Sequence, residues 1–521
     1  MRRSKLLLWV IPLVLGAAAQ AAPRNVGSYV VTPDVVTSAS GKKFEIERGL
    51  VFVPENRNNP NSRTIAVHFV RLPALTKNSD AKHPPIFMLP GGPGSEFNFA
   101  DERLQKTLQN MRRTRDVIYV SQRGNPRQPG LTSALRIYNP AAPLDQPLTA
   151  ASIKASTREA FTAAMQEWKA KGVDLRGYDI INIVDDVYDL RAALGYDKIV
   201  LRGCSFGSQW SFSYLKRWPQ TVDRAWLSGV EPLDYAYDSP AWLWASMERL
   251  AKQADADPTL KKHLPKGGVM EVLRTVITRL EAKPATVAFL PPGKTEEVRI
   301  TVGAEDLRQT LQDAPGTSAR DELTNWPRML LEMYAGDYRY LAAKSWERRS
   351  GGAGEPLILP LIDNSLGITA ARDAKLLAEP EARWLGDIND FYHNTRDITP
   401  TPRVDDAFRA DWRLEMPVLL TNGDLDWSTP IENAKHARGF LAQGHLVEIG
   451  GATHCTETPE LPELLPDLLA KLNQFYEVDF AKTPATDYFK TLPSSVSYPT
   501  LKFRAPTAPS TFDEWRANAK K

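Results

Sequence analysis

The first half of the chain alternates short, continuous apolar runs with segments whose apolar positions repeat every three or four residues. The continuous runs stand at 85–89, at 116–120 after its first residue, Asp116, and at 199–201. Such runs are typical of strands that are buried on both faces of a sheet. The apolar positions of 178–194 fall on one face of a helix, and Gly195 follows as a helix stop. Strands that alternate with helices predict an α/β protein with a mostly parallel central sheet, flanked by helices.

This pattern is interrupted once. After the apolar run 225–227 the chain becomes mainly helical, and sheet-like runs return only at 417–423 and 445–450. The interruption predicts a core in two parts with a mainly helical cap inserted between them. The predicted divisions are a signal peptide at 1–21, a first core part at 22–234, a cap at 235–405, a second core part at 406–475 and a surface tail at 476–521.

The first residues have the pattern of a secretory signal. Arg2, Arg3 and Lys5 precede an apolar run at 6–15, and the small-x-small sequence of 19–21 follows as a cleavage site. The apolar run is too short to span a bilayer comfortably, so no stable membrane insertion is expected after cleavage. The sequence predicts a periplasmic or secreted protein.

The charge of the chain is nearly balanced. Lys and Arg number 65 against 62 Asp and Glu, which gives a formal net charge of +3. Without the strong basic field that a polyanion requires, nucleic acid is not an expected partner. The expected partner is a peptide or small acyl substrate, and the oligomeric state stays open.

The strongest chemical signal is a glycine-framed serine, Ser205. The strand-like run 199–201 leads into Gly203-Cys204-Ser205-Phe206-Gly207, and a helical pattern follows. A nucleophilic serine on a sharp strand-to-helix turn needs glycines two residues before and after it, because larger side chains would collide there. Ser205 is therefore the candidate nucleophile.

A serine nucleophile needs a histidine base and a carboxylate that orients the base. With this type of turn, the acid and then the histidine follow the serine along the chain, each in a loop after a strand. Asp426 follows the run 417–423, and His454 follows the run 445–450. Asp424 competes with Asp426 for the acid, but a turn residue bonded to its own backbone is the simpler role for it.

The oxyanion of the reaction needs two backbone donors. One is the N–H of the residue after the nucleophile, Phe206, and the other comes from the glycine-rich loop 90–94, where we expect Gly92 to supply it. The sequence has no metal-ligand spacing, Walker loop or dinucleotide fingerprint, so no cofactor and no metal are expected.

The chain has two cysteines, and each adjoins a candidate catalytic residue. Cys204 precedes Ser205 and Cys455 follows His454. If the site assembles, the sulfur atoms come together, and an oxidising compartment permits a bond between them. Two buried thiols that pack under the site are the alternative, and we favour this alternative on sequence alone.

These motifs together resemble the prolyl aminopeptidase and tripeptidyl aminopeptidase branch of the α/β-hydrolases. The resembling segments are Leu89–Gly94, Gln122–Gly124, Gly203–Gly207, Gly423–Pro430 and the loop of His454. The resemblance implies an α/β-hydrolase fold with Ser205, Asp426 and His454 as the triad and with Gly92 and Phe206 as oxyanion donors. The family pattern often has His, Asp and Gly where this chain has Pro90, Ser121 and Cys455.

The resemblance implies a serine exopeptidase that removes a residue, often proline, or a short peptide from a free N-terminus. Acidic cap residues hold the substrate ammonium group in that family. Glu231, Glu322 and Glu332 are candidates for this role here. The alternative function is a carboxylesterase or another acyl hydrolase with the same triad, because fold and triad do not fix the substrate.

Overall fold

The computed structural model describes residues 26–76, 83–125, 135–312, 320–455, 461–507 and 509–518. The predicted signal peptide, 1–21, lies outside the described residues. No helix within the described ranges is both long enough and apolar enough to cross a membrane.

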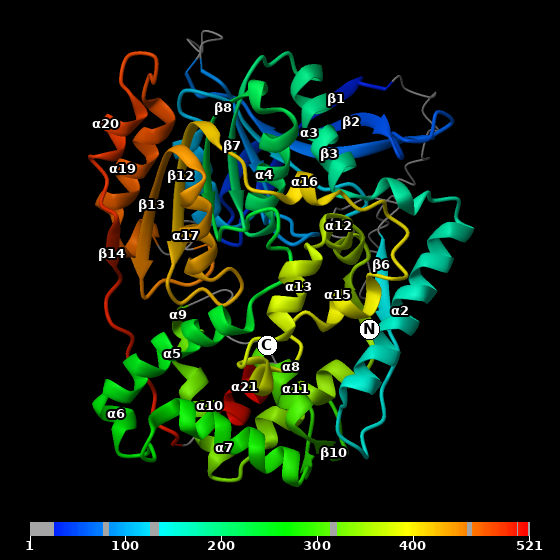
Figure 1. The fold of residues 1–521 in the computed structure, drawn as a ribbon, viewed down its shortest axis with the longest axis vertical. Coiled ribbons are helices and arrows are strands. Elements are labelled where there is room, and N and C mark those ends of the chain that lie inside the picture. Colours follow the sequence, from blue (N-terminus) through cyan, green and yellow to red (C-terminus); the bar gives the residue numbers. More distant parts are fainter. Residues whose placement is uncertain are drawn as a thin grey trace, which may run out of the picture.

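A sheet of ten strands forms the centre of the molecule, in the order β1-β2-β3-β5-β4-β7-β8-β12-β13-β14 (Figure 1). Neighbouring strands are parallel from β5 to β14, and β1, β2 and β3 extend the sheet in antiparallel fashion. The strands are β1 (Tyr29–Thr37), β2 (Lys43–Pro54), β3 (Thr64–Leu72), β4 (Ile86–Leu89), β5 (Val117–Val120), β7 (Ile199–Cys204), β8 (Val222–Ser228), β12 (Leu414–Gly423), β13 (Leu441–Gly450) and β14 (Ser495–Ser497).

Helices cover both faces of this sheet, which explains why its strands are continuously apolar. In β4, Phe87 and Leu89 pack into one core, whereas Ile86 and Met88 pack into the other. The helices of the first face are α3 (Ile180–Ala193), α4 (Phe206–Arg217) and α17 (Ile431–Gly439). Those of the second face are α1 (Glu102–Met111), α18 (Leu461–Leu464), α19 (Pro466–Glu477) and α20 (Ala485–Phe489). The predicted mostly parallel sheet between helices is confirmed.

A mainly helical part with its own apolar core lies below the sheet in Figure 1. It falls between β8 and β12 in the chain and also holds a hairpin of β9 (Ala285–Phe289) and β10 (Val298–Val302). The helices between β8 and β12 are α5 (Pro240–Ala256), α6 (Pro258–Lys261), α7 (Gly268–Ala282), α8 (Ala304–Gln312), α9 (Arg320–Leu323), α10 (Asn325–Tyr334), α11 (Arg339–Arg349), α12 (Ile358–Leu366), α13 (Ala370–Leu377), α14 (Ala382–Leu385), α15 (Asp390–Thr395) and α16 (Asp406–Arg409).

Packing crosses the predicted divisions in several places. Helix α12 packs into the same core as the sheet, although it lies within 235–405. Strand β11 (Gly352–Pro356) pairs with β6 (Arg136–Asn139), which precedes the long helix α2 (Ala150–Ala170).

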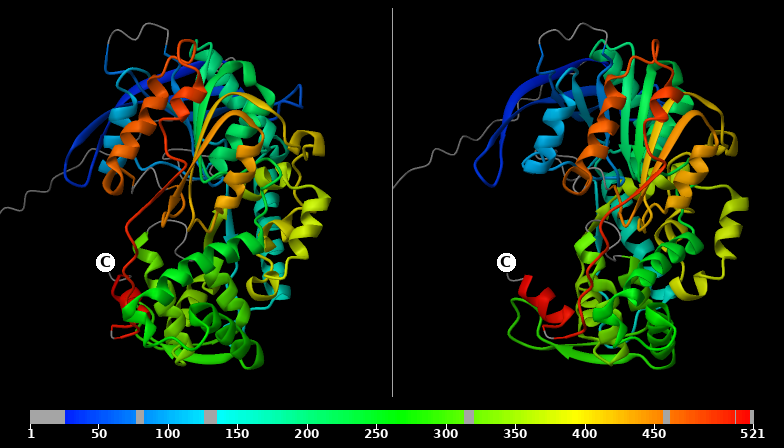
Figure 2. Two further views of the ribbon diagram at one scale, coloured as in Figure 1. Left: turned by 60° about the vertical axis from the view of Figure 1, so that its left-hand side comes forward. Right: turned by 90° about the vertical axis from the view of Figure 1, so that its left-hand side faces the viewer.

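The tail also does more than cover the surface. It adds β14 to the sheet and then runs along the molecule to α21 (Thr511–Asn518) (Figure 2). On this path it buries Leu501, Phe503 and Phe512 in the cap core.

Candidate active site

Ser205 stands on the predicted turn between β7 and α4. Its backbone has φ 60° and ψ −136°, a conformation that residues other than glycine rarely adopt. The turn is tight on both sides: a Cβ atom built on Gly203 would lie 2.2 Å from the carbonyl oxygen of Gly207, and one on Gly207 would lie 2.0 Å from that of Leu89. The glycines of the motif are therefore required by close backbone approach.

The glycine-rich loop lies directly beside this turn. A Cβ atom on Gly91 would lie 3.1 Å from Cβ of Ser205, and Gly92 has a left-handed φ of 107°. The side chain of Gln122 holds the loop, because its Oε1 accepts a 2.6 Å hydrogen bond from the Gly94 N–H and its Nε2 donates to the Gly91 carbonyl at 3.1 Å. Gly92 and Ser205 line the same cavity, and Phe206 begins α4.

Ser121, where the resemblance suggests an acid, contacts an acid from elsewhere in the chain. Its hydroxyl donates to the carboxylate of Glu96, which directly follows the glycine-rich loop. Glu96 also accepts from the Tyr119 hydroxyl at 2.6 Å and from Asn125 Nδ2 at 2.8 Å. A carboxylate thus lies against Ser121 even though the chain departs from the family pattern there.

Asp426 and His454 form a bonded pair. Asp426 is fully buried, and its Oδ2 lies 2.8 Å from Nδ1 of His454. The same carboxylate accepts hydrogen bonds from the N–H groups of Ser428 and Thr429 and from the Thr429 hydroxyl, at 2.9, 2.8 and 2.7 Å. This network fixes the carboxylate and, through it, one edge of the imidazole ring.

Asp424, the competing acid, and His445, the other histidine near a strand end after the acid loop, have other contacts. Asp424 accepts a 2.7 Å hydrogen bond from the Gly451 N–H, so it braces the loop that carries His454, and burial raises the pKa of Asp424. His445 lies along β13, and its Nε2 is 2.9 Å from the carbonyl oxygen of Pro493 in the tail.

Ser205 and His454 meet at one small cavity. Both residues line a space of about 250 Å³, together with residues of the glycine-rich loop. Gly229 confirms how closely they approach, because a Cβ atom there would lie 2.9 Å from Cε1 of His454 and 3.1 Å from the backbone nitrogen of Ser205. The structure therefore brings all three predicted triad residues together.

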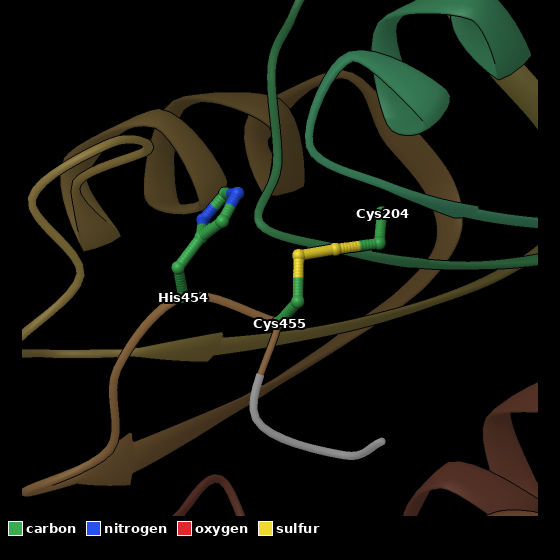
Figure 3. A group of neighbouring side chains, drawn as sticks. All are labelled: Cys204, His454 and Cys455. Atoms are coloured by element: carbon green, nitrogen blue, oxygen red, sulfur yellow. A yellow bond between two sulfur atoms is a disulfide. The ribbon is translucent and has the colours of Figure 1, made fainter. Parts of the chain in front are cut away.

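Cys204 and Cys455 form a disulfide, with their Cα atoms 6.0 Å apart (Figure 3). The expectation of two buried thiols is wrong, because the turn of Ser205 and the loop of His454 bring the Cα atoms within bonding range. Among the described residues, Cys204, His454 and Cys455 are the one group with the ligand types and spacing of a metal site. Since the two sulfur atoms are bonded to each other, they are not thiolate ligands in this state.

The structure also places one acidic side chain, Glu231, against Ser205 and two more, Asp238 and Asp363, near Glu231. Glu231 and Asp238 follow β8, and Asp363 lies on α12. Enclosure in the protein and the negative charges of Asp238, Asp363 and Asp426 hold the pKa of Glu231 well above its ordinary value, while hydrogen bonding with Ser205 lowers it. We call Glu231, Asp238 and Asp363 the acidic cluster.

The other two members of the acidic cluster share this environment. Burial raises the pKa of Asp238 to about 7, with Asp426 acting in the same direction and Arg372 and His454 opposing it. Burial also holds the pKa of Asp363 well above its ordinary value, although a hydrogen bond with Tyr392 lowers it. At each member of the cluster burial therefore outweighs the groups that favour the charged form.

One of these acids, Glu231, is a candidate from the sequence, whereas Asp238 and Asp363 are not. Asp363 could have been noticed because an acid directly follows the apolar run 357–362. Asp238 stands before a helix, and nothing else in the sequence around it indicates a functional role. Glu332 lies away from the cluster, because it pairs with Arg328 at 3.2 Å and accepts from the Thr511 N–H. Glu322 lies in α9, and its side chain is outside the described part of the chain.

Comparisons with known proteins agree with the fold. A family described as "alpha/beta hydrolase fold" matches residues 84–267, which hold the glycine-rich loop, the turn of Ser205 and strand β8. A search of curated proteins finds no match.

Solved structures resemble the chain distantly. A proline iminopeptidase-related protein from Thermus thermophilus is 15% identical, with a TM-score of 0.34 over 84% of this chain and 97% of that one. An esterase from Thermogutta terrifontis is 15% identical, with a TM-score of 0.33 over 82% and 99%. A serine hydrolase from Cycloclasticus zankles is 11% identical, with a TM-score of 0.33 over 86% and 98%. Sequence identities and TM-scores this low carry no information about the substrate of this chain.

The strand order, the turn at Ser205 and the matching segment point to one conclusion. The parallel strands carry the serine, the acid and the histidine at their carboxyl ends, in that chain order, and a mainly helical segment interrupts them. Such a framework is that of a hydrolase. This chain has the alpha/beta hydrolase fold.

Proposed function

We propose that the protein is a serine aminopeptidase that releases one residue from the free N-terminus of a peptide through an acyl-enzyme. The observation that carries this proposal is the acidic cluster beside Ser205. A buried carboxyl whose burial outweighs the nearby positive charge stays protonated, and a bound cation lets it ionise and pair with that cation. The α-ammonium group of a peptide is such a cation, and a neutral ester substrate offers none.

The triad supplies the chemistry of this proposal. With Nδ1 of His454 bonded to Asp426, Nε2 is the nitrogen that takes the proton of Ser205 as its oxygen attacks the scissile carbonyl. The N–H groups of Gly92 and Phe206 stabilise the oxyanion. His454 then gives the proton to the leaving amine, and water releases the residue by the same route in reverse.

The place of Glu231 favours the release of a single residue. In an N-terminal residue the ammonium nitrogen is two bonds from the carbonyl carbon that Ser205 attacks. A tripeptide would put it roughly 7 Å farther away, at about 3.3–3.6 Å per extended residue. Since Glu231 interacts with Ser205 itself, an ammonium group on Glu231 belongs to the residue being released.

Export remains part of the proposal. A disulfide beside the nucleophile is supported by an oxidising compartment, such as the periplasm or the cell exterior, and is rare in a reducing cytosol. The predicted signal peptide at 1–21 accords with that location.

Amino-acid anilides with a free amine, their N-acetylated forms and short acyl esters test the proposal. We expect turnover of free-amine anilides only, with proline among the first residues to be tried. In Glu231→Gln the KM for free-amine anilides should rise about 10- to 100-fold, because a charged hydrogen bond is worth roughly 1.5–3 kcal/mol. Glu332→Gln is the matched control and should leave KM unchanged, since Glu332 contacts Arg328 and Thr511 rather than the acidic cluster. Equal hydrolysis of acetylated anilides would contradict the proposal and favour the esterase alternative.

Binding of the amine should depend on pH near neutrality. The pKa of Asp238 is raised to about 7, so this carboxyl is largely neutral below pH 7 and negative above it. The KM for a free-amine anilide should therefore fall as pH rises through about 7, until the substrate amine loses its own proton near pH 8. In Asp238→Asn this fall should disappear. The rate at which a fluorophosphonate labels Ser205, measured in parallel, reports the triad without a substrate amine. If Asp238→Asn changed the pH dependence of this labelling rate as much as that of KM, the assignment of Asp238 to amine binding would be contradicted.

A further inference from the structure

The disulfide lies directly beside the proposed nucleophile and base. Cys204 is bonded through its backbone to Ser205, and Cys455 is bonded to His454, so the bridge joins the immediate neighbours of the nucleophile and the base. The two cysteines are 251 residues apart in the chain, and the helical cap lies between them. Figure 3 shows the bridge spanning from the end of β7 to the loop that carries His454.

Backbone strain marks one residue of the bridge, Cys455, and the neighbour of the other, Ser205. Among the described residues other than glycine, only Ser205 and Cys455 have a positive φ, 60° and 56°. A left-handed conformation costs an L-residue roughly 1–2 kcal/mol and persists where the surroundings enforce it. The bridge is a direct means of enforcing it at Cys455.

Other contacts hold the ring of His454 and the loop before it. Asp426 and Thr429 hold the ring of His454, and Asp424 braces the loop before it through the Gly451 N–H. The disulfide fixes the residue immediately after His454 to the strand that carries Ser205. It therefore sets the separation between the two partners of the proton transfer.

We infer that the Cys204–Cys455 disulfide is a positioning element for Ser205 and His454, and that breaking it slows the chemical step. This inference rests on the proposed triad. A dithiol reductant breaks the S–S bond by supplying two electrons and two protons; two thiols form and the reductant closes to a cyclic disulfide. The sulfur atoms are open to attack, because both cysteines are partly exposed and line the cavity of Ser205 and His454.

Reduction of the folded wild-type protein tests the inference. The readouts are kcat, KM and the rate at which a fluorophosphonate labels Ser205, with a chelator present so that the freed thiols bind no metal. After reduction, confirmed by alkylation of two thiols, kcat and the labelling rate should fall about 10- to 100-fold, the range expected for a 1 Å misplacement. KM should change less than about twofold, because the acidic cluster is on other elements. Oxidised glutathione should restore the rate.

Two variants separate positioning from general stability. Cys455→Ala removes the bridge at a left-handed position, whereas Cys455→Gly removes it with a residue that adopts this conformation freely. Both should label slowly and ignore reductant. A wild-type labelling rate in Cys455→Gly would overturn the inference, as would a loss of activity on reduction that only follows the fraction of unfolded protein in a thermal melt.

The labelling rate also separates this inference from the proposed function. If reduction slows labelling but the oxidised protein ignores peptides, the positioning role stands and the peptidase proposal fails. If free-amine anilides are hydrolysed and reduction changes neither kcat nor labelling, the peptidase proposal stands and the positioning role fails.

Discussion

Replacing Ser205 with alanine is expected to lower kcat for the preferred anilide by about 10³- to 10⁶-fold. The reason is that, in the proposed mechanism, the acyl-enzyme forms on the Ser205 oxygen, and alanine has no oxygen to replace it. Only residual turnover from the oxyanion donors and from substrate binding should remain. Because alanine retains the backbone and Cβ of serine, the melting temperature should stay close to that of the wild type.

Ser213→Ala is the matched control for this prediction. Ser213 lies on the same helix α4, is buried, and donates only to the backbone carbonyl of Gln209 at 2.9 Å. It should keep wild-type turnover and should be labelled by a fluorophosphonate at Ser205. A Ser205→Ala protein that is folded and still turns over at the normal rate, or is labelled as before, would rule out Ser205 as the nucleophile.

The second large effect is expected at Asp426. Asp426→Asn should lower kcat by about 10⁴-fold, because an amide cannot stabilise the imidazolium of His454 and favours the wrong tautomer. The substitution also replaces a buried carboxylate that accepts three hydrogen bonds besides that of His454, so the free energy of unfolding should fall as well. Steady-state kinetics on protein that circular dichroism shows to be folded measures the loss of kcat separately from the loss of stability.

Asp424→Asn gives the comparison that decides which acid acts. Asn can still accept the hydrogen bond from the Gly451 N–H, so this variant should keep kcat within about tenfold of the wild type, the equivalent of roughly 1.4 kcal/mol. If instead Asp424→Asn removed activity and Asp426→Asn spared it, the assignment of the acid would be reversed.

The parts of the fold that follow from burial could be predicted from sequence. Runs such as 86–89 and 117–120 are apolar throughout because helices cover both faces of the sheet. The strands and their parallel arrangement could therefore be predicted from the sequence. The predicted triad residues meet in space for a related reason. Glycines 203 and 207 are imposed by close backbone contacts, and such local constraints leave a readable motif.

The parts that depend on distant contacts could not be predicted. Strand β14 is only three residues long and exists because β13 offers an edge to pair with. Asp363 lies on α12 and Asp238 lies after β8, and only the packing of α12 on the main core brings them together. The disulfide was misjudged because two cysteines 251 residues apart give no sequence signal of their separation in space.

The most direct test of the account is the mass of the products from a defined peptide mixture. Heptapeptides that differ only in their first residue, and the same mixture after N-acetylation, are incubated with the oxidised protein and examined by mass spectrometry. The proposed aminopeptidase function predicts the loss of one residue from a subset of the free peptides and no change in the acetylated ones. Release of a tripeptide, or equal cleavage of acetylated peptides, would contradict an ammonium site at Glu231 that selects the residue attacked by Ser205.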